Sequence, residues 1–392
     1  NHNLREHGTY FRAWPIARGL AEKGHEIVMA TVSPDRLYRT TKIERDGVLV
    51  YETPKWTWPL MEADEGWGPL GILERAKIAG LQKFDWVYSF AHTPNCHFPA
   101  RIAMLRSARL AVDWCDDYGA GIFPQREALR EASPHKRRMR WFVQRLGERH
   151  EARMETAILR KAERVTVIGE VLREKAIAAC VPPEKILLVP SGADLDLFSP
   201  KPQAKARLEL GLPETGKLIV YIANYHPDEH FLMSVLKEVF AKVADARMAY
   251  TGPMFDSAGS KEPVIRDRLI HLGKLPMERV PLVVASGDVA LIPMDDTPHN
   301  RARCPQKLMD YLASGRPIVT SDVGEVGRLF RQHPEIGRAS KPTVENYSRD
   351  IIELLETTEE RREEMGRAAR HLADSYYNWP RAINAIEQCL TK

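Results

Sequence analysis

Apolar residues recur every three or four positions behind Gly8, at Phe11, Trp14, Ala17, Leu20 and Ala21. This spacing predicts a helix with Thr9 as its N-cap, and Pro15 fits only if the regular helix begins near Trp14. A strand is predicted next, from Glu26 to Thr31. Further short apolar runs predict strands at 47–52, 85–90, 109–114 and 164–168, with helices between most of them.

The second half of the chain repeats this alternation of strand and helix. Strands are predicted at 217–223, 247–251, 269–272, 289–293 and 317–320, and helices at 229–243, 305–313 and 347–358. Strands that alternate with helices are typical of a parallel sheet covered on both faces. The sequence therefore predicts an α/β protein with two Rossmann-like, doubly wound parallel-sheet domains that face a cleft.

A stretch rich in turn-forming residues, at 189–194, separates the two halves. We expect an N-terminal domain at 1–188, a C-terminal domain at 189–374, and a last helix at 375–392 that crosses back onto the first domain. The first five residues have the character of a loop that follows a strand, so we expect a further first strand upstream of them.

The composition is that of an ordinary globular protein, with 44% hydrophobic and 28% charged residues among 392. No apolar run approaches the ~18–20 residues that a membrane helix needs. A net charge of +4 argues against a dedicated nucleic-acid binder. The five cysteines are odd in number and form no CxxC pair, so we expect reduced thiols in the cytoplasm and no disulfide framework or zinc site.

One segment supplies all of the net positive charge. Residues 136–164 hold ten basic and four acidic side chains, and their apolar positions have helical spacing. A basic amphipathic helix of this kind docks on anionic lipid or presents a solvated face. The loop 54–69 adds Trp56, Trp58 and Trp67, which suit a sugar platform or a membrane interface, or pack beneath the loop.

A second charged feature surrounds the helix start that Pro305 predicts in the second half. Arg301, Arg303 and Lys307 crowd this start, and the free amides of a helix N-terminus add partial positive charge. Cations together with amides are typical of an anion site. Asp310, within one turn, has the reach to accept two ribose hydroxyls. The alternative is a solvated basic turn with a surface carboxylate.

Polar residues also follow the predicted strands of the first half. Asp113, Asp116 and Asp117 lie at the end of one strand, where their mutual repulsion favours a polar ligand or a raised pKa. Capping of the next helix would explain one of the three. His92 follows the preceding strand, and a lone histidine is more often structural. Gly8 permits a ligand to approach the helix start closely, or is a plain turn, without a GxGxxG or Walker motif.

Four segments resemble the large family 4 of retaining glycosyltransferases with the GT-B fold. They are GTYFRAWPIARGLAEKGHEIVMAT (8–31), KILLVPSGADLDLFSP (185–200), the stretch 271–293, and CPQKLMDYLASGRPIV (304–319). The last resembles the family motif P-x-K-x-x-E-Y-x-A-x-G-x-P-V and is the most specific. The resemblance spans nearly the whole chain. It implies transfer of a sugar from a nucleotide sugar with retention of configuration, without metal or other cofactor.

The resemblance also implies roles for single residues. Asp310 stands where the family has the Glu that binds the donor ribose. Gln306 and Lys307 stand where helix-start amides meet the diphosphate, and Gly8 matches the glycine loop facing the same phosphates. Asp116 falls near the family's His or Asp beside the reacting centre. Asp117 is the alternative match for that catalytic position, and His92, Trp56 and Trp58 are candidates for contact with the acceptor.

The chain departs from the family pattern at two places. Ala302 stands where the first Glu of a paired acidic motif is usual, and the stretch 224–230 lacks the Arg and Lys that commonly follow the strand opening the second domain. The positive partners of the diphosphate must then come from elsewhere. Arg301, Arg303 and Lys307 are the candidates.

We expect a glycosyltransferase that moves a sugar to a glycan or lipid-linked acceptor. The protein would be cytoplasmic and peripheral on the inner face of a membrane, held through residues 136–164, with no nucleic-acid partner. One alternative is a GT-B nucleotide-sugar epimerase, although the 304–319 motif is typical of transferases. The other is a non-catalytic protein that binds a sugar nucleotide or a partner enzyme, which the departures at Ala302 and Asn224 would favour.

Overall fold

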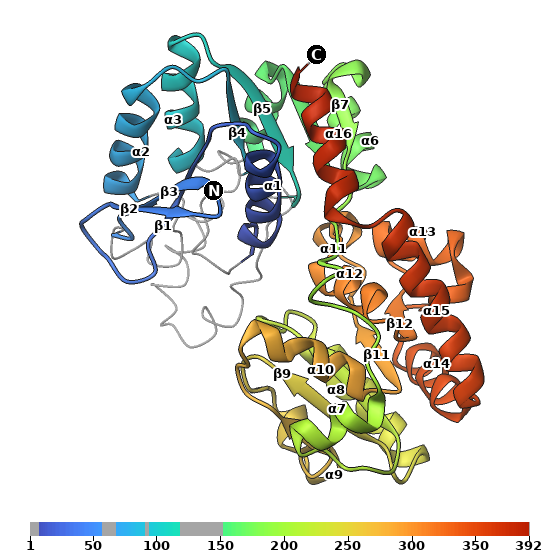
Figure 1. The fold of residues 1–392 in the computed structure, drawn as a ribbon. Coiled ribbons are helices and arrows are strands. Elements are labelled where there is room, and N and C mark those ends of the chain that lie inside the picture. The colour runs from blue at the N-terminus through green and yellow to red at the C-terminus, as the bar shows by residue number, and fades with distance from the viewer. Residues whose placement is uncertain (1–7, 57–67, 91–93, 118–151, 392) are drawn as a thin grey trace, which may run out of the picture. The chain divides into compact units, whose positions relative to one another are not determined.

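The computed structural model describes residues 8–56, 68–90, 94–117 and 152–391. The chain forms two compact units (Figure 1). Unit 1 consists of Asn1–Pro190 with Trp379–Lys392, and unit 2 consists of Ser191–Asn378. Among the described residues, no helix combines the length and the apolar character that crossing a bilayer requires.

Unit 1 contains two sheets in its described part. In one, β1 (Ile27–Val32) pairs parallel with β3 (Val48–Thr53), and β2 (Thr41–Arg45) pairs antiparallel with β3. The other is parallel, in the order β4 (Trp86–Ser89), β5 (Arg109–Trp114), β6 (Arg164–Val167) and β7 (Ile186–Leu188). The sequence prediction does not include β2, because none of its residues is buried and it contains no apolar run.

The helices of unit 1 include α1 (Tyr10–Glu22), α2 (Pro69–Leu81), α3 (Pro94–Leu105), α6 (Glu170–Ala178) and α16 (Trp379–Thr391). Helices α1 and α16 cross in close contact, since a Cβ placed on Gly19 would lie 2.2 Å from Ile383 Cδ1. Only glycine permits this approach in a close-packed interior. Trp14, Trp379 and Ile386 fill the core cluster that the two helices share.

Unit 2 is built on one parallel sheet. Its strand order is β10 (Leu269–His271), β9 (Arg247–Thr251), β8 (Leu218–Ile222), β11 (Val289–Ile292), β12 (Ile318–Ser321) and β13 (Gly337–Ser340). Chain order runs in opposite directions on the two sides of the β8–β11 pair. This reversal is the topological switch point of a doubly wound sheet.

Both faces of the unit 2 sheet are covered by helices. Leu218 and Val220 of β8 belong to one core cluster, and Ile219 and Tyr221 belong to the other. The first cluster includes residues of α10 (Val280–Ser286), α12 (Gln306–Ala313), α13 (Gly324–Gln332) and α15 (Glu359–Ser375), and α7 (Gln203–Leu210) packs on α10. The second includes α8 (Glu229–Lys242), α9 (Pro263–Arg266) and α14 (Val344–Glu356). The α/β architecture predicted for this half is confirmed.

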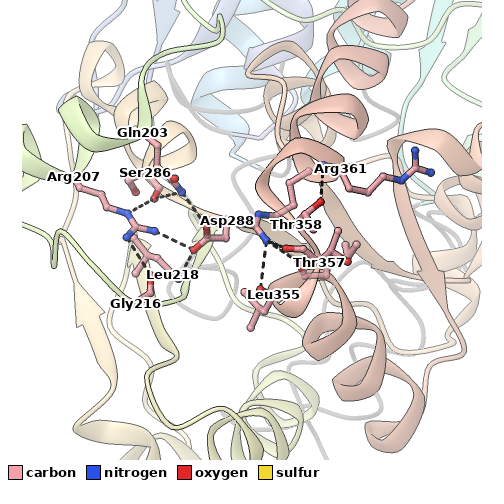
Figure 2. Close-up of polar contacts among 12 residues, drawn as sticks. Gln203, Arg207, Gly216, Leu218, Ser286, Asp288, Leu355, Thr357, Thr358 and Arg361 are labelled. Carbon is pink, nitrogen blue, oxygen red and sulfur yellow. Dashed lines mark hydrogen bonds and ion pairs between the residues drawn. The ribbon is translucent and has the colours of Figure 1, made fainter.

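Asp288, immediately before β11, joins several elements at the amino edge of the unit 2 sheet (Figure 2). Its carboxylate accepts hydrogen bonds from the Leu218 amide at 2.7 Å, from Arg207 Nη2 at 3.0 Å and from Gln203 Nε2 at 3.2 Å. Arg362 Nη2 lies 3.7 Å away. A cavity of about 320 Å³ opens beside these residues. Because Arg207 and Arg362 already face Asp288, we interpret this edge as a structural junction.

Two local predictions need correction. Helix α1 begins at Tyr10 and contains Pro15 within it, so the predicted start near Trp14 is wrong. Pro15 removes one backbone donor, but the flanking Trp14 and Ile16 are buried and hold the helix against the core. Thr9 takes the N-cap position as predicted, yet its hydroxyl bonds the Cys115 thiol rather than a helix amide.

Candidate functional site

Asp228 organises the carboxyl edge of the unit 2 sheet at the switch point. It follows β8, is buried, and accepts hydrogen bonds at 3.0 Å from the Asp295 amide and at 3.0 Å from Asn300 Nδ2. These bonds connect the segment after β8 to the segment after β11 and to α11 (Pro298–Ala302). Parallel sheets bind ligands at this position. The carboxyl edge therefore holds a rigid polar framework.

The framework continues from Asn300 to an arginine. Asn300 Oδ1 accepts a hydrogen bond from Arg303 Nη1 at 3.0 Å, so one amide side chain connects Asp228 to Arg303. Burial and the charge of Asp228 raise the pKa of the neighbouring Asp295. Sequence reasoning did not select Asp228 or Asn300. Asn300 directly precedes Arg301, and Asp228 follows a predicted strand of the same sheet; these positions are the signal that would have found them.

Lys307 extends from the first turn of α12 to the end of β8. Its ammonium group lies 4.0 Å from the centre of the Tyr221 ring, a cation–π contact. The side chain is half-buried, and the enclosure of the ammonium group together with the nearby charge of Arg303 lowers the pKa of Lys307 to about 7. Asp228 and Asp310 act in the opposite direction. With the pKa this low, the ammonium form is only partly populated at neutral pH, and an anion arriving here would favour it.

Asp310 lies one turn further along α12 and is only 7% exposed. Burial is the main cause that raises the pKa of Asp310 to about 7, and Asp194 adds to it, while a hydrogen bond with Gln306 opposes the rise. Gln306 also donates from Nε2 to the Gly192 carbonyl at 2.9 Å. Helix α12 begins at Gln306, so Pro305 is the N-cap and not the predicted first-turn residue. The first two turns of α12 thus carry a half-buried cation, Lys307, and a buried carboxylate, Asp310.

The two arginines of the charged turn have different surroundings. Arg301 is exposed and forms a two-pronged pair with Asp296, with Nε–Oδ1 at 2.6 Å and Nη2–Oδ2 at 3.0 Å. Arg303 is half-buried and bonds the neutral Asn300 side chain. Because a neutral partner leaves its charge uncompensated, Arg303 is better placed than Arg301 to meet an anion beside Lys307.

The three carboxylates of the first half, which are close in the sequence, have different surroundings in the structure. Asp113 is fully buried within β5, where Arg12 of α1 binds it through Nε at 2.7 Å and Nη2 at 2.9 Å. Thr166 donates to Asp113 Oδ1 at 2.5 Å, and the Tyr88 hydroxyl lies 3.3 Å from the same oxygen. Asp113 is therefore a structural residue whose charge is neutralised inside the sheet.

Asp117 and Asp116 also differ from each other. Asp117 is buried and forms an ion pair with Lys175 of α6. Asp116 is half-buried and has the Cys115 thiol 3.9 Å from its Oδ2. A carboxylate that is already paired with a lysine is a poor partner for a substrate hydroxyl. The pair with Lys175 therefore argues against Asp117 as a contact for a ligand.

The glycine turn and the carboxylate segment are neighbours in unit 1. Gly8 has φ 46°, a conformation that favours glycine, and it precedes α1 directly. The hydrogen bond between Thr9 and Cys115 places the start of α1 beside Asp116. Two of the predicted site residues, Gly8 and Asp116, are thus brought together at the carboxyl edge of β5.

Several predicted residues lie outside the described part of the chain: His92, Trp58, Trp67 and residues 136–151 of the basic segment. Trp56 is described; its amide donates to the Leu37 carbonyl at 3.1 Å. Residues 152–161 of the basic segment are helical, and there Glu155 accepts a hydrogen bond from Trp114 Nε1 at 2.8 Å. Within the ranges that the structure describes, no three His, Cys, Asp or Glu side chains are grouped to hold a metal ion.

Two family models match the chain. The glycosyl transferase 4-like domain matches residues 8–192, and a second model, described as glycosyl transferase-like, matches residues 231–388. Between them they cover most of the chain. The first includes Gly8 and Asp116, and the second includes Lys307 and Asp310.

Curated relatives are more distant. A Bacillus subtilis (strain 168) protein named as a teichuronic acid biosynthesis glycosyltransferase, TuaH, is 27% identical over 198 residues, which is 49% of this chain and 46% of the relative. A D-inositol 3-phosphate glycosyltransferase of Segniliparus rotundus is 24% identical over 196 residues, 47% of this chain and 42% of the relative. The chain thus spans a little under half the length of these curated relatives.

Solved structures share the fold over nearly the whole chain. Sucrose-phosphate synthase from Thermosynechococcus elongatus matches with a TM-score of 0.71 and 17% identity, over 97% of this chain and 92% of its own. Anabaena HepE in complex with UDP and glucose matches with a TM-score of 0.68 and 14% identity, over 98% and 96%. The two family models, together with two Rossmann-like units on this shared fold, show that the chain belongs to the GT-B glycosyltransferases of group 1.

Proposed function

We propose that the protein transfers a sugar from a nucleotide-sugar donor to a glycan or lipid-linked acceptor, with retention of anomeric configuration and without a metal ion. The observation that carries the proposal is the position of Lys307. Its half-buried ammonium group lies over Tyr221 at the switch point of the unit 2 sheet, one turn before the buried Asp310. A cation and a carboxylate at this spacing match the diphosphate and the ribose of a sugar nucleotide.

The donor lies against unit 2 in this proposal. Asp310 accepts hydrogen bonds from the ribose hydroxyls, and the first amides of α12 bind the diphosphate together with Lys307. Arg303, which donates a hydrogen bond to Asn300 Oδ1, supplies a second cation. These groups replace the Arg and Lys that the stretch 224–230 lacks. UDP sugars are the first donors to test, because the solved structure of Anabaena HepE contains UDP and glucose.

The reaction breaks the bond between the anomeric carbon and the diphosphate oxygen. A bond from the acceptor hydroxyl oxygen forms on the same face of the sugar, and the hydroxyl proton passes to the departing phosphate oxygen. Negative charge builds on the diphosphate in the transition state, and Lys307, Arg303 and the α12 amides stabilise it. Because two cations already serve this charge, no metal ion is assigned to the step. In unit 1, Asp116 is assigned to the acceptor hydroxyl, because it falls near the family position beside the reacting centre.

The acceptor reaches the protein from a membrane in this proposal. The basic segment 136–164 and the tryptophans of the loop 54–69 suit a protein that works at the inner membrane surface. An acceptor anchored in that membrane would then be presented to unit 1.

Turnover with a panel of nucleotide sugars tests the function. The protein is incubated with each donor, alone and with a membrane extract, and nucleotide release and the anomeric signal of the product are followed by NMR. Acceptor-dependent release and a retained anomeric configuration are expected from the wild type, with both lost in Lys307→Met. Release without an acceptor, accompanied by isomerised sugar, would indicate an epimerase. Tight nucleotide binding without any turnover would indicate a binding protein.

A further inference from the structure

Four large apolar side chains stand exposed on two neighbouring helices of unit 1. On α2, Leu73 is 53% exposed and Leu81 is 68% exposed. On α3, Phe98 is 46% exposed and Leu105 is 83% exposed. Each pair is separated by seven or eight residues, two turns of helix, so each helix carries its own apolar stripe. We call these four residues the α2–α3 face.

The two stripes point to the same side of unit 1. The opposite side of α2, with Arg75 and Ile78, and the opposite side of α3, with Cys96 and Ala100, line one cavity beside β4. Arg75 Nη1 donates to the Asn95 carbonyl at 3.4 Å, which joins the two helices along this inner side. Figure 1 shows α2 and α3 lying next to each other. Residues opposite these inner positions therefore share one outward surface.

Cations alternate with the apolar residues on this surface. Lys77 lies midway between Leu73 and Leu81, and Arg101 lies between Phe98 and Leu105; both are exposed. Lys83 and Arg106, also exposed, extend the positive charge just beyond the two helices. The acidic residue on the same part of α2 is Glu74, which bonds Lys77 at 2.6 Å and the Thr40 hydroxyl at 3.1 Å.

We propose that the α2–α3 face docks on an anionic lipid bilayer, with its apolar side chains in the interface and Lys77 and Arg101 at the lipid phosphates. Apolar side chains interleaved with long cationic ones suit the headgroup layer, where each kind finds its own partner. A second copy of the chain is disfavoured, because a two-fold contact would place the cations of one face against those of the other. This inference rests on the proposed function and adds a second surface that meets the membrane.

The placement fits an acceptor that is anchored in lipid. Helix α3 follows β4, so Phe98, near its start, lies toward the carboxyl edge of that sheet, where Asp116 follows β5. Leu105, at the far end of α3, lies toward the opposite edge. Docking along this face would therefore lay α3 on the lipid surface, with the carboxyl edge of the unit 1 sheet at one end of the contact.

Vesicle flotation of the full chain tests the surface. The probe vesicles contain equal parts of phosphatidylglycerol and phosphatidylcholine, and phosphatidylcholine alone is the uncharged control. Leu73→Ser with Leu105→Ser removes apolar area, and Lys77→Glu with Arg101→Glu reverses charge. Leu208→Ser with Lys205→Glu is the matched control on α7 of unit 2, where Leu208 is 70% exposed. Thermal unfolding and UDP titration confirm that each variant keeps its fold and its nucleotide site.

We expect wild type and the α7 control to float with anionic vesicles and not with neutral ones. Each α2–α3 pair of substitutions should lower the partition coefficient by roughly tenfold, with UDP binding unchanged. Equal flotation of all variants, or no flotation of the wild type at low salt, overturns the proposal while leaving the donor site intact. A soluble dimer of wild type that the substitutions dissociate overturns it as well, because the face would then be a protein interface.

Discussion

Lys307 and Tyr221 connect two separate strand–helix units of the same sheet, with the ammonium group of one 4.0 Å from the ring centre of the other. Tyr221 belongs to β8, and the segment after β8 contains no Arg or Lys from Asn224 to His230. Lys307 comes from α12 and supplies a cation at this strand end. The cation at this strand end thus comes from α12, across the switch point, and not from the segment that follows β8.

Lys307→Met should weaken UDP binding by roughly tenfold to a hundredfold, because charge-assisted hydrogen bonds to phosphate are lost. It should not lower stability at pH 7. The native pKa of Lys307 is about 7, below the unfolded value of 10.5, so the wild type gains stability relative to the variant as pH rises from 7 to 10.5. Calorimetric titration and urea unfolding measure the two effects. Arg301→Met, which removes an exposed cation paired with Asp296, is the control and should bind UDP nearly normally.

Asp310→Asn should weaken nucleotide binding and raise stability at neutral pH. Burial raises the pKa of Asp310 from 3.8 to about 7, so the native state holds a proton that the unfolded chain releases between those values. The wild type therefore loses stability relative to the variant as pH rises from about 4 to 7, and the difference is constant above that. Urea unfolding at several pH values checks this course. A stability difference that does not change with pH would show that Asp310 titrates normally.

Donor binding should favour proton uptake at Lys307 and proton release at Asp310. Phosphate favours the protonated form of Lys307, and ribose hydroxyls favour the ionised form of Asp310. With both pKa values about 7, the two effects oppose each other in the wild type at pH 7. Asp310→Asn should then take up as much as about half a proton on binding UDP, and Lys307→Met should release a similar amount. Titrations in buffers of different ionisation enthalpy measure this. Equal proton uptake or release by the two variants on binding UDP would contradict the assignment of Lys307 to the phosphate and Asp310 to the ribose.

Arg12→Met should destabilise unit 1 by about 3–5 kcal/mol, because it leaves the fully buried carboxylate of Asp113 without its cation. Arg173→Met, which breaks the partly exposed pair with Glu170, should cost less than about 1 kcal/mol. Chemical unfolding monitored by circular dichroism compares the two. A similar small cost for both would contradict the assignment of Arg12 as the cation that the buried Asp113 requires.

The strands of unit 2 could be predicted because each strand of a parallel sheet covered on both faces is a short run of apolar residues. The helices could be predicted because they fall between these runs. The charged turn around Pro305 was also visible, since Arg301, Arg303 and Lys307 are close in sequence. The sequence did not indicate which of these cations is paired with a carboxylate. Arg301 meets Asp296 while Arg303 meets Asn300, a difference that depends on side-chain direction alone.

The carboxylates after β5 show the same limit more clearly. Asp113, Asp116 and Asp117 form one acidic run in the sequence, yet Arg12, 101 residues away, neutralises Asp113, and Lys175, 58 residues away, pairs with Asp117. Such partners come from other parts of the chain and leave no local pattern. The repulsion predicted for these residues is therefore relieved at Asp113 and Asp117 by distant cations.

The most direct measurement of the donor site is a crystal structure of the protein with UDP bound. The account predicts phosphate oxygens within hydrogen-bond distance of Lys307 Nζ and the first amides of α12, with the ribose hydroxyls at Asp310. The cavity at the amino edge of unit 2, beside Arg207 and Arg362, should contain no nucleotide. UDP at that amino-edge cavity, or a diphosphate that does not contact α12, would contradict the assignment of the donor site.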